Sequence, residues 1–208
     1  MAALRRELDD GSIGIDLPDG ALRLWPDAFE ADQAAELFAE LRQGIDWQQE
    51  EIVIFGARRP VPRLVAWHGD PSAHYTYSGT AHVPRPWTPR LQHIRERVEG
   101  LAGTPFNAVL LNLYRDGRDG MGWHADDEPE LGPAPVIASV SLGATRRFCL
   151  RHRRRKDHKL DLSLAHGNLL LMAASTQRHW VHAVPKTTRP VGERINLTFR
   201  LVRPGWLR

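Results

Sequence analysis

The residues best suited to chemistry lie between Asn112 and Asp126, where an apolar segment runs through a glycine-rich turn into a His-x-Asp pair. In an extended chain, side chains at positions i and i+2 point to the same side, so His124 and Asp126 can present an imidazole and a carboxylate to one metal ion. Two histidines and one carboxylate on one face of an iron ion leave three positions open for a co-substrate and dioxygen. The pair therefore predicts two ligands of such a site, and the third must come from elsewhere.

A second His-x-Asp pair, His68 and Asp70, makes a chance match a real alternative for either pair. The Asp70-Pro71 step is typical of a turn, and no apolar strand leads into it. His182 lies in an apolar segment downstream and can complete the site of the first pair, whereas His179 has the opposite parity and is expected to be structural. We therefore favour the pair at 124 and 126.

The segment from Arg194 to Arg200 alternates strictly between polar and apolar residues, which predicts a strand with one polar and one apolar face. If the polar face points into a β core, its two guanidinium groups need an anion, because an unpaired buried arginine is very costly. A small dicarboxylate fits, since arginine binds carboxylates with a planar fork. The alternative is an edge strand whose polar face meets solvent.

Together these motifs resemble the AlkB family of iron(II)- and 2-oxoglutarate-dependent dioxygenases over roughly residues 47 to 201. The resemblance implies iron(II) as the cofactor and 2-oxoglutarate and dioxygen as co-substrates. It also implies that Arg194 pairs with the distal carboxylate of 2-oxoglutarate and that Arg200 lies near the oxo-acid end. By the same resemblance, the catalytic iron ligands are His124, Asp126 and His182, and the residues that bind 2-oxoglutarate are Asn112, Tyr114, Arg194, Asn196 and Arg200.

Smaller matches resemble the branch of this family that inserts a hydrophobic finger into duplex DNA, where an apolar wedge helps to hold the base stack open. A core strand is the alternative for the finger, and core packing is the alternative for the tyrosines. The two acidic residues after the iron ligand would favour a positively charged methylated base. The implied substrate-binding residues are the finger tip Ile54, Phe55 and Gly56, the following Arg63, the base-stacking segment Tyr75, Tyr77 and Ser78, and the acidic Asp127 and Glu128.

The scaffold that positions these residues is expected to contain two helices, from Asp32 to Gln43 and from Pro89 to about Gly100. The pattern then changes to strands, which predicts an α+β fold with a β-sandwich or double-sheet barrel backed by helices. The expected strands are 107–114, 135–143, 147–152, 168–172, 179–184 and 194–201. The resemblance specifies a double-stranded β-helix, or jelly-roll, core at 104–201 with an N-terminal nucleotide-recognition lid at 47–87. We expect one dioxygenase domain at 23–208 and a loosely ordered arm at 1–22.

The composition fits one folded domain, since 42% of the 208 residues are hydrophobic. No apolar run approaches the roughly 20 residues of a membrane helix, and the single cysteine, Cys149, fits a reducing compartment, so we expect a cytoplasmic protein without a membrane partner. Between Arg146 and Lys159, eight lysines or arginines accompany one acid, Asp157. This block is either a solvated loop or a surface that binds phosphates.

The expected function is oxidative demethylation of 1-methyladenine and 3-methylcytosine in DNA, in which hydroxylation of the N-methyl group releases formaldehyde. Duplex DNA is favoured over single strands, and no obligate protein partner is expected. The alternatives are an RNA or protein demethylase with the same iron centre, or a catalytically silent module that binds nucleic acid. In one departure, the chain has only two positive charges, Lys186 and Arg189, where relatives with a finger carry a basic triplet.

Overall fold

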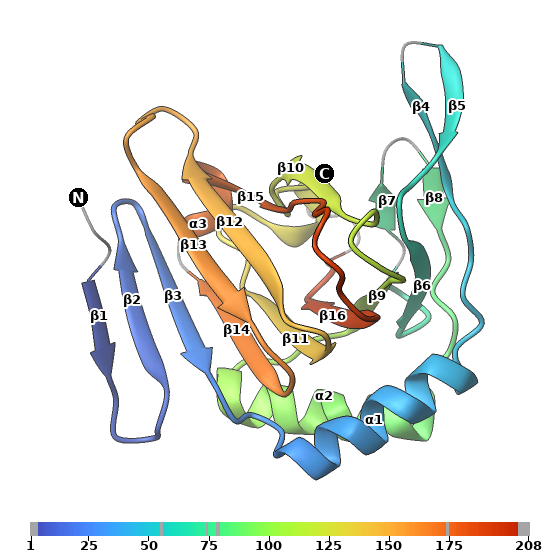
Figure 1. Ribbon diagram of the computed structural model, residues 1–208, viewed down its shortest axis with the longest axis horizontal. Coiled ribbons are helices and arrows are strands. Elements are labelled where there is room, and N and C mark those ends of the chain that lie inside the picture. The colour runs from blue at the N-terminus through green and yellow to red at the C-terminus, as the bar shows by residue number, and fades with distance from the viewer. Residues whose placement is uncertain (1–3, 55, 74, 78–79, 174, 204–208) are drawn as a thin grey trace.

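The protein, described by a computed structural model for residues 4–54, 56–73, 75–77, 80–173 and 175–203, contains two antiparallel sheets that face each other (Figure 1). Their facing side chains form one apolar core between the sheets. The larger sheet contains, in spatial order, β1 (Leu4–Glu7), β2 (Ile13–Leu17), β3 (Gly20–Trp25), β14 (Asn168–Ala173), β11 (Ile137–Gly143), β16 (Arg194–Arg200), β9 (Ala108–Tyr114) and β6 (Leu64–Gly69). The smaller sheet contains β10 (Met121–His124), β15 (Trp180–Val184), β12 (Arg146–His152) and β13 (Lys159–Leu164). This double-sheet arrangement is the expected jelly-roll core.

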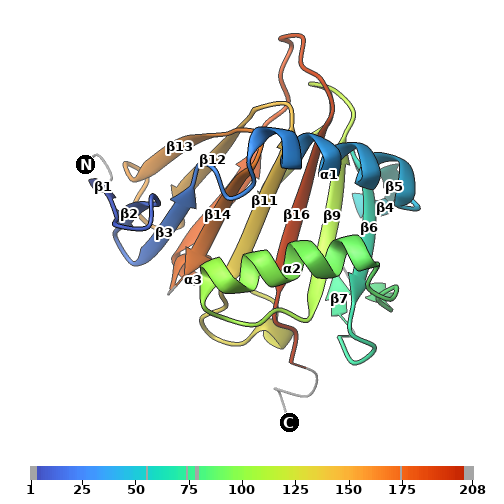
Figure 2. The same ribbon diagram turned by 90° about the horizontal axis from the view of Figure 1, so that it is seen from below.

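Two long helices, α1 (Ala31–Gly44) and α2 (Pro89–Ala102), lie across the outer face of the larger sheet (Figure 2). Their buried side chains join the outward-facing apolar residues of the sheet in a second core. Helix α2 begins at Thr88, whose Oγ1 accepts a hydrogen bond from the backbone N–H of Leu91 at 3.2 Å, and ends at Gly103 with a left-handed φ of 65°. The predicted helices and the six predicted strands are confirmed, with ends within two residues of those observed.

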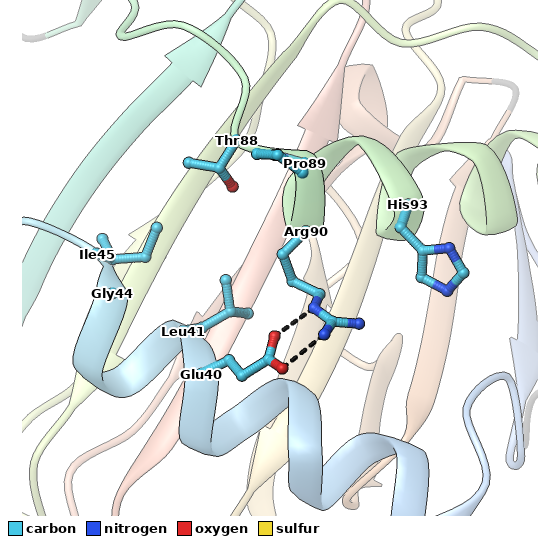
Figure 3. A pocket seen from close by; sticks show the side chains of 8 residues that line it. All are labelled: Glu40, Leu41, Gly44, Ile45, Thr88, Pro89, Arg90 and His93. Carbon is cyan, nitrogen blue, oxygen red and sulfur yellow. Dashed lines mark hydrogen bonds and ion pairs between the residues drawn. The ribbon is translucent and has the colours of Figure 1, made fainter.

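The two helices also interact with each other through an ion pair between Arg90 of α2 and Glu40 of α1 (Figure 3). An open groove of about 570 Å³ lies beside this pair, between the end of α1 and the start of α2. None of the residues proposed for chemistry lines this groove. No helix within the described ranges is both long enough and apolar enough to cross a membrane.

The prediction of a loosely ordered arm at 1–22 was wrong for residues 4–22, the part of it that the structure describes. Residues 4–7 and 13–17 form strands β1 and β2, and β3 continues the larger sheet by pairing with β14. The strands are held because Ile15, Leu17 and Leu22 are buried in the core between the sheets. Their period-2 apolar pattern is short and interrupted by charged residues, so periodicity alone did not distinguish them.

The predicted bounds of the lid, 47–87, and of the catalytic core, 104–201, also need correction. Strand β6 lies inside the predicted lid but pairs with β9 at the edge of the larger sheet, and it is almost wholly buried. The remaining lid consists of two separate hairpins, β4 (Glu51–Ile54) with β5 (Ala57–Pro60), and β7 (Tyr75–Tyr77) with β8 (Thr80–His82). The β4–β5 hairpin projects away from both sheets (Figure 1).

Candidate active site

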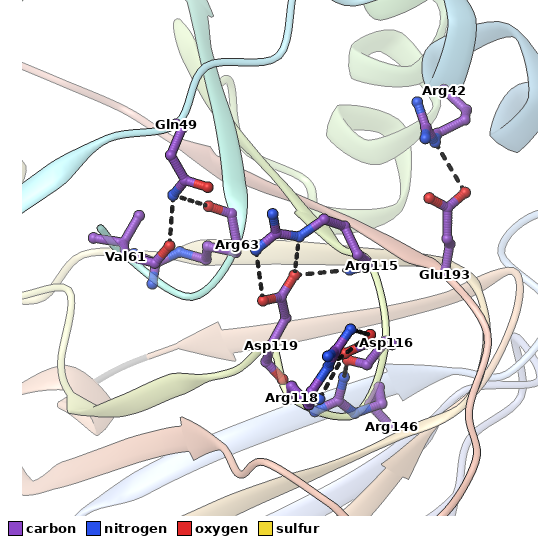
Figure 4. Close-up of polar contacts among 10 residues, drawn as sticks. All are labelled: Arg42, Gln49, Val61, Arg63, Arg115, Asp116, Arg118, Asp119, Arg146 and Glu193. Carbon is purple, nitrogen blue, oxygen red and sulfur yellow. Dashed lines mark hydrogen bonds and ion pairs between the residues drawn. The ribbon is translucent and has the colours of Figure 1, made fainter. Parts of the chain in front are cut away.

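The turn that leads into the predicted iron ligands is held by a dense set of polar contacts (Figure 4). Arg115 forms two hydrogen bonds with the buried carboxylate of Asp119, at 2.7 and 2.9 Å. Burial opposes ionisation, but the Arg115 guanidinium outweighs it and lowers the pKa of the Asp119 carboxyl group. Arg146 donates to the backbone carbonyls of Asp116, Asp119 and Pro185. These contacts fix the position at which β10 begins.

Two glycines allow this turn to approach the segment after β15 closely. A Cβ atom on Gly117 would lie 2.4 Å from the carbonyl oxygen of Thr187, and one on Gly120 would lie 2.7 Å from that of Val184. A larger residue at either position would push β10 away from β15.

The register of β10 and β15 then brings the metal-ligand candidates together. His124 and His182 are direct partners across the two strands, and their rings lie 4.2 Å apart between centroids. Asp126 follows β10, and its Oδ2 lies 3.6 Å from Nε2 of His182. One ligand atom from each of the three residues lies within 4.8 Å of those of the other two. The three residues that the sequence singled out thus form one compact group that could hold a metal ion.

The protonation of this group suits metal binding, which requires neutral histidines and an ionised carboxylate. Burial lowers the pKa of His182 to about 3 and also lowers the pKa of His124. Burial alone would raise the pKa of Asp126, but Arg200 and the two imidazoles lower it to about 2. The Nδ1–H of His124 donates to the carbonyl oxygen of Gly122 at 2.9 Å, so its Nε2 keeps a lone pair for a metal.

The predicted 2-oxoglutarate residues come from neighbouring strands of the larger sheet. Asn112 of β9 and Asn196 of β16 are direct partners, as are Tyr114 and Arg194. All of these residues are buried, and all except Arg194 line a narrow cavity together with the three ligand candidates and Arg200. The amide nitrogen of Asn196 donates to Ser139 Oγ and to the carbonyl oxygen of Val140.

Arg194 lies behind this cavity, with its guanidinium carbon 5.3 Å from the centre of the Tyr114 ring. Its side chain is among the largest fully buried ones, and burial lowers its pKa to about 10, so it remains a cation at neutral pH. Its Nη2 donates to Ser141 Oγ at 2.8 Å, but Nε and Nη1 have no hydrogen-bond partner among the described residues. A buried cation with two unsatisfied donors fits an anionic ligand, as the distal carboxylate of 2-oxoglutarate would provide.

Arg200, the other arginine of this strand, forms a buried ion pair with Asp126. It therefore links the 2-oxoglutarate strand to the metal-ligand candidate. This pairing was not foreseen, because it joins two residues that are far apart in the chain and carry no shared local pattern.

The predicted substrate-binding residues are described only in part. Arg63 is buried, and its Nε donates to the side-chain oxygen of Asn112 at 2.8 Å, so it contacts the 2-oxoglutarate site. The carboxylate of Asp127 pairs with Arg153, at 2.5 Å, and Glu128 is partly buried. Gly56 has the left-handed φ of 76° that the tip of the β4–β5 hairpin requires. Phe55 and Ser78 lie outside the described residues, and for Ile54, Tyr75 and Tyr77 only the backbone strands are described.

The second His-x-Asp pair is structural. Nδ1 of His68 donates to the carbonyl oxygen of Pro86 at 2.8 Å, and Asp70 accepts a hydrogen bond from the Trp87 indole at 2.7 Å. Burial lowers the pKa of His68, which keeps it neutral. These contacts join β6 to the segment before α2, and within the described residues this pair belongs to no group of three metal-ligand candidates.

A further group, Asp19, His152 and His179, also has metal-like spacing. However, Nδ1 of His152 accepts backbone N–H groups from Arg154 and Arg155, at 3.1 and 3.0 Å. Its proton is therefore on Nε2, which lies 3.3 Å from Asp19 Oδ2 and has no lone pair to offer a metal. We interpret this group as a contact that fastens the β2–β3 turn to β12.

Gln177 is one of the residues near the site that the sequence did not single out, along with cavity-lining residues such as Ser139 and Thr198. Gln177 is buried in the short helix α3 (Thr176–His179), and its side-chain oxygen accepts the backbone N–H of Asp126 at 3.0 Å. Its place shortly before His182 was the only indication in the sequence, and glutamine is too common in turns for that to be informative.

Two histidines and a carboxylate at one end of a double-sheet barrel, beside a buried arginine with two donors that have no partner within the described residues, define a non-haem iron oxygenase with a dicarboxylate co-substrate. The family model of the 2OG-Fe(II) oxygenase superfamily matches residues 21–200. The chain is 42% identical over 186 residues to the DNA oxidative demethylase ALKBH2 of Mus musculus, covering 85% of this chain and 78% of that protein. It is 40% identical over 198 residues to the alpha-ketoglutarate-dependent dioxygenase alkB homolog 3 of Rattus norvegicus, covering 90% of this chain and 66% of that protein.

The fold agrees with these relatives. The solved structure of OsALKBH1 superimposes with a TM-score of 0.62 at 21% identity, covering 89% of this chain and 99% of that one. The chain belongs to the AlkB family of iron(II)- and 2-oxoglutarate-dependent dioxygenases. Its cofactor is therefore iron(II), and its co-substrates are 2-oxoglutarate and dioxygen.

Proposed function

We propose that this protein is a DNA oxidative demethylase that removes methyl groups from the ring nitrogens of damaged bases, with 1-methyladenine and 3-methylcytosine as substrates. The observation that carries the proposal is the compact group of His124, Asp126 and His182 beside the buried, unsatisfied guanidinium of Arg194. Relatives of about 40% identity that are named DNA oxidative demethylases support DNA as the substrate.

The chain supplies the ligands and the binding groups for this reaction. When bound, iron(II) with 2-oxoglutarate and dioxygen supplies oxidation of a C–H bond on the N-methyl group, after which the hydroxymethyl product loses formaldehyde. His124, Asp126 and His182 would hold the iron, and Arg194 would bind the distal carboxylate of 2-oxoglutarate. The ion pair with Arg200 keeps the carboxylate of Asp126 ionised and oriented.

The β4–β5 hairpin supports the assignment of a finger. It pairs with no other strand of the described chain, and its residues Val53, Arg58 and Arg59 are exposed, Val53 at 70%. An exposed hairpin that ends in an aliphatic-Phe-Gly tip is suited to enter a base stack, whereas a core strand would be covered. We assign Phe55 as the residue that fills the gap left by the extruded base.

The base itself would lie between the β7–β8 hairpin and the iron. We assign Tyr77 as the stacking residue and Tyr75 and Ser78 as its neighbours in the pocket wall. The candidates for sensing a positively charged base are the two acidic residues after the iron ligand, Asp127 and Glu128, and the carboxylate of Asp127 also pairs with Arg153. In this assignment Arg63 supports Asn112 and does not contact the base directly.

A basic hollow between the start of β12 and the segment after β15 supports binding to duplex DNA. It measures about 460 Å³ and is lined by Arg147, Lys186 and Arg189, among other residues, with no acidic side chain in its lining. Arg146 and Arg147 come from β12 and add two positive charges to the two on the segment after β15, although Arg146 is buried and donates to backbone carbonyls. A cluster of lysine and arginine side chains of this kind suits the phosphates of the strand opposite the lesion.

The test measures succinate and formaldehyde release on 3-methylcytosine oligonucleotides, single-stranded and duplex, with matched RNA as a comparison. We expect turnover on both DNA substrates, and Phe55→Ala should reduce it on duplex DNA much more than on single strands. Leu4→Ala removes an exposed apolar side chain on β1 and serves as the control. Equal loss on both substrates would reject the finger, faster turnover on RNA would make this an RNA demethylase, and no turnover on any methylated substrate would reject the function.

A further inference from the structure

We propose that Gln177 is a positioning residue that fixes the backbone of Asp126 and thereby places the iron ligand, an inference that rests on the metal centre of the proposed function. Gln177 is 1% exposed, and its side-chain oxygen accepts the backbone N–H of Asp126. It acts through Asp126 and would not touch the metal, the co-substrate or the base.

The side-chain amide of Gln177 is held in one orientation by a hydrogen bond at each end. The backbone N–H of Asp126 donates to Oε1 of Gln177 at 3.0 Å, and the other end of the same amide, Nε2, donates to the sulfur of Met172 at 3.4 Å. Rotating the amide by 180° would turn an NH₂ group toward the N–H of Asp126, so the amide has only one acceptable orientation. The side-chain oxygen therefore has a fixed place beneath Asp126.

Asp126 needs such a support because regular strand pairing ends before it. The ladder between β10 and β15 ends at the pair His124–His182, and residues 125–128 have no regular secondary structure. Asp126 is 3% exposed, so without Gln177 its N–H would be buried without an acceptor. The segment would turn to find another partner and carry the carboxylate away from the two histidines.

Helix α3 is a suitable anchor because it is connected to both sides of the site. It directly precedes β15, which carries His182. Arg153 contacts both the carboxylate of Asp127, at 2.5 Å, and the backbone carbonyl of Gln177, at 3.4 Å. Asp126 and Asp127 are thus both connected to α3, Asp126 directly and Asp127 through Arg153. Helix α3 in turn leads into β15, which carries His182.

The N-terminal hairpin holds α3 in place from the outside. Thr176 Oγ1 accepts the backbone N–H of Ala21 at 3.0 Å, and the indole of Trp180 donates to the carbonyl oxygen of Pro18 at 2.8 Å. A Cβ on Gly20 would lie 2.9 Å from Thr176 Oγ1, so the turn and the helix are in close contact. Strands β2 and β3 therefore support the position of Gln177 and, through it, of Asp126.

The test is Co(II) binding to the metal-free full-length protein in the presence of 2-oxoglutarate, followed by the visible d–d absorption of Co(II) at a temperature well below unfolding. Gln177→Met keeps the length and burial of the side chain but removes the acceptor. Asn168→Leu is the matched control, because Asn168 is also buried and makes two hydrogen bonds to backbone groups, at Ala165 and Pro26, away from the site.

We expect both variants to lose thermal stability, but only Gln177→Met to weaken Co(II) binding, by about 10- to 100-fold, and to change the absorption spectrum. Gln177→Asn, whose shorter side chain cannot reach Asp126, should show the same loss and carries the test if Gln177→Met does not fold. Affinities of the folded Gln177 variants within twofold of wild type, or an equal loss in Asn168→Leu, would overturn the proposal. A wild-type protein that does not bind Co(II) would overturn the metal centre itself, whereas a protein that binds Co(II) but does not act on DNA would overturn only the proposed function.

Discussion

Replacing Arg194 by methionine should have opposite effects on ligand binding and on the stability of the ligand-free protein. Arg194 is a fully buried cation whose Nε and Nη1 have no hydrogen-bond partner within the described residues, while its Nη2 donates to Ser141 at 2.8 Å. Leaving one partner of a buried ion pair unpaired costs about 3–5 kcal/mol. Since about 1.4 kcal/mol corresponds to a factor of ten, the dissociation constant for 2-oxoglutarate should rise by about 100-fold to several thousand-fold.

In the ligand-free protein the same substitution removes a buried charge and two unsatisfied donors. Each unsatisfied buried donor lowers the stability of the wild-type protein by about 1–3 kcal/mol, so removing the two donors stabilises the variant. Losing the hydrogen bond to Ser141 lowers the stability of the variant by about 1 kcal/mol. The free energy of unfolding of the ligand-free variant should therefore rise by about 1–5 kcal/mol, which urea unfolding can measure, while calorimetric titration measures 2-oxoglutarate binding. A variant that binds 2-oxoglutarate within threefold of wild type, or that is clearly less stable without it, would refute the role of Arg194.

Three further predictions follow from the site and its surroundings. Arg63→Met should raise the dissociation constant for 2-oxoglutarate about tenfold without changing metal affinity, because Asn112 loses the charged donor that lies 2.8 Å from its side-chain oxygen in the wild-type protein. Calorimetry measures both affinities, and weaker metal binding would contradict this role. A divalent metal at 100 times its dissociation constant should stabilise the metal-free protein by about 2.7 kcal/mol, seen as a rise in Tm by differential scanning fluorimetry, and His182→Ala should lose this rise. Burial raises the pKa of the Cys149 thiol from 9.0 to about 11, so its fraction of thiolate at pH 8 falls about 100-fold. Its reaction with iodoacetamide, followed by mass spectrometry, should therefore be about 100-fold slower in the folded protein than in urea. Equal rates would show that the thiol is accessible and its pKa is not raised.

The parts of the fold that the sequence predicts are those with a strong local pattern. The strict alternation from Arg194 to Arg200 and the capped, amphipathic helix from Pro89 have the structure that their periods indicate. Strand β13 was hidden because its apolar alternation begins within the basic block, which was interpreted by charge alone. Strand β10 has only four residues and contains a glycine, so it has no clear period of its own.

The metal-ligand candidates were predicted because spacing and residue type are themselves the requirement of the chemistry. His124 and His182 lie together because they are direct partners in the pairing of β10 with β15. The contacts that orient these residues were not predictable in the same way. Arg200 with Asp126, Arg63 with Asn112 and Gln177 with Asp126 join segments 49 to 74 residues apart, and only the folded chain brings them together.

His124, Asp126 and His182 are proposed to hold the iron that supplies oxidation of an N-methylated base in DNA. The most direct measurement is a single-turnover assay of iron(II)-loaded protein with 2-oxoglutarate, dioxygen and a duplex oligonucleotide that carries one 3-methylcytosine. We predict one formaldehyde, one succinate and one restored cytosine for each methyl group removed, and none of the three from Asp126→Ala, a variant that removes one ligand candidate. Restored cytosine without succinate, or products from Asp126→Ala at the wild-type rate, would contradict the proposed function of this metal group.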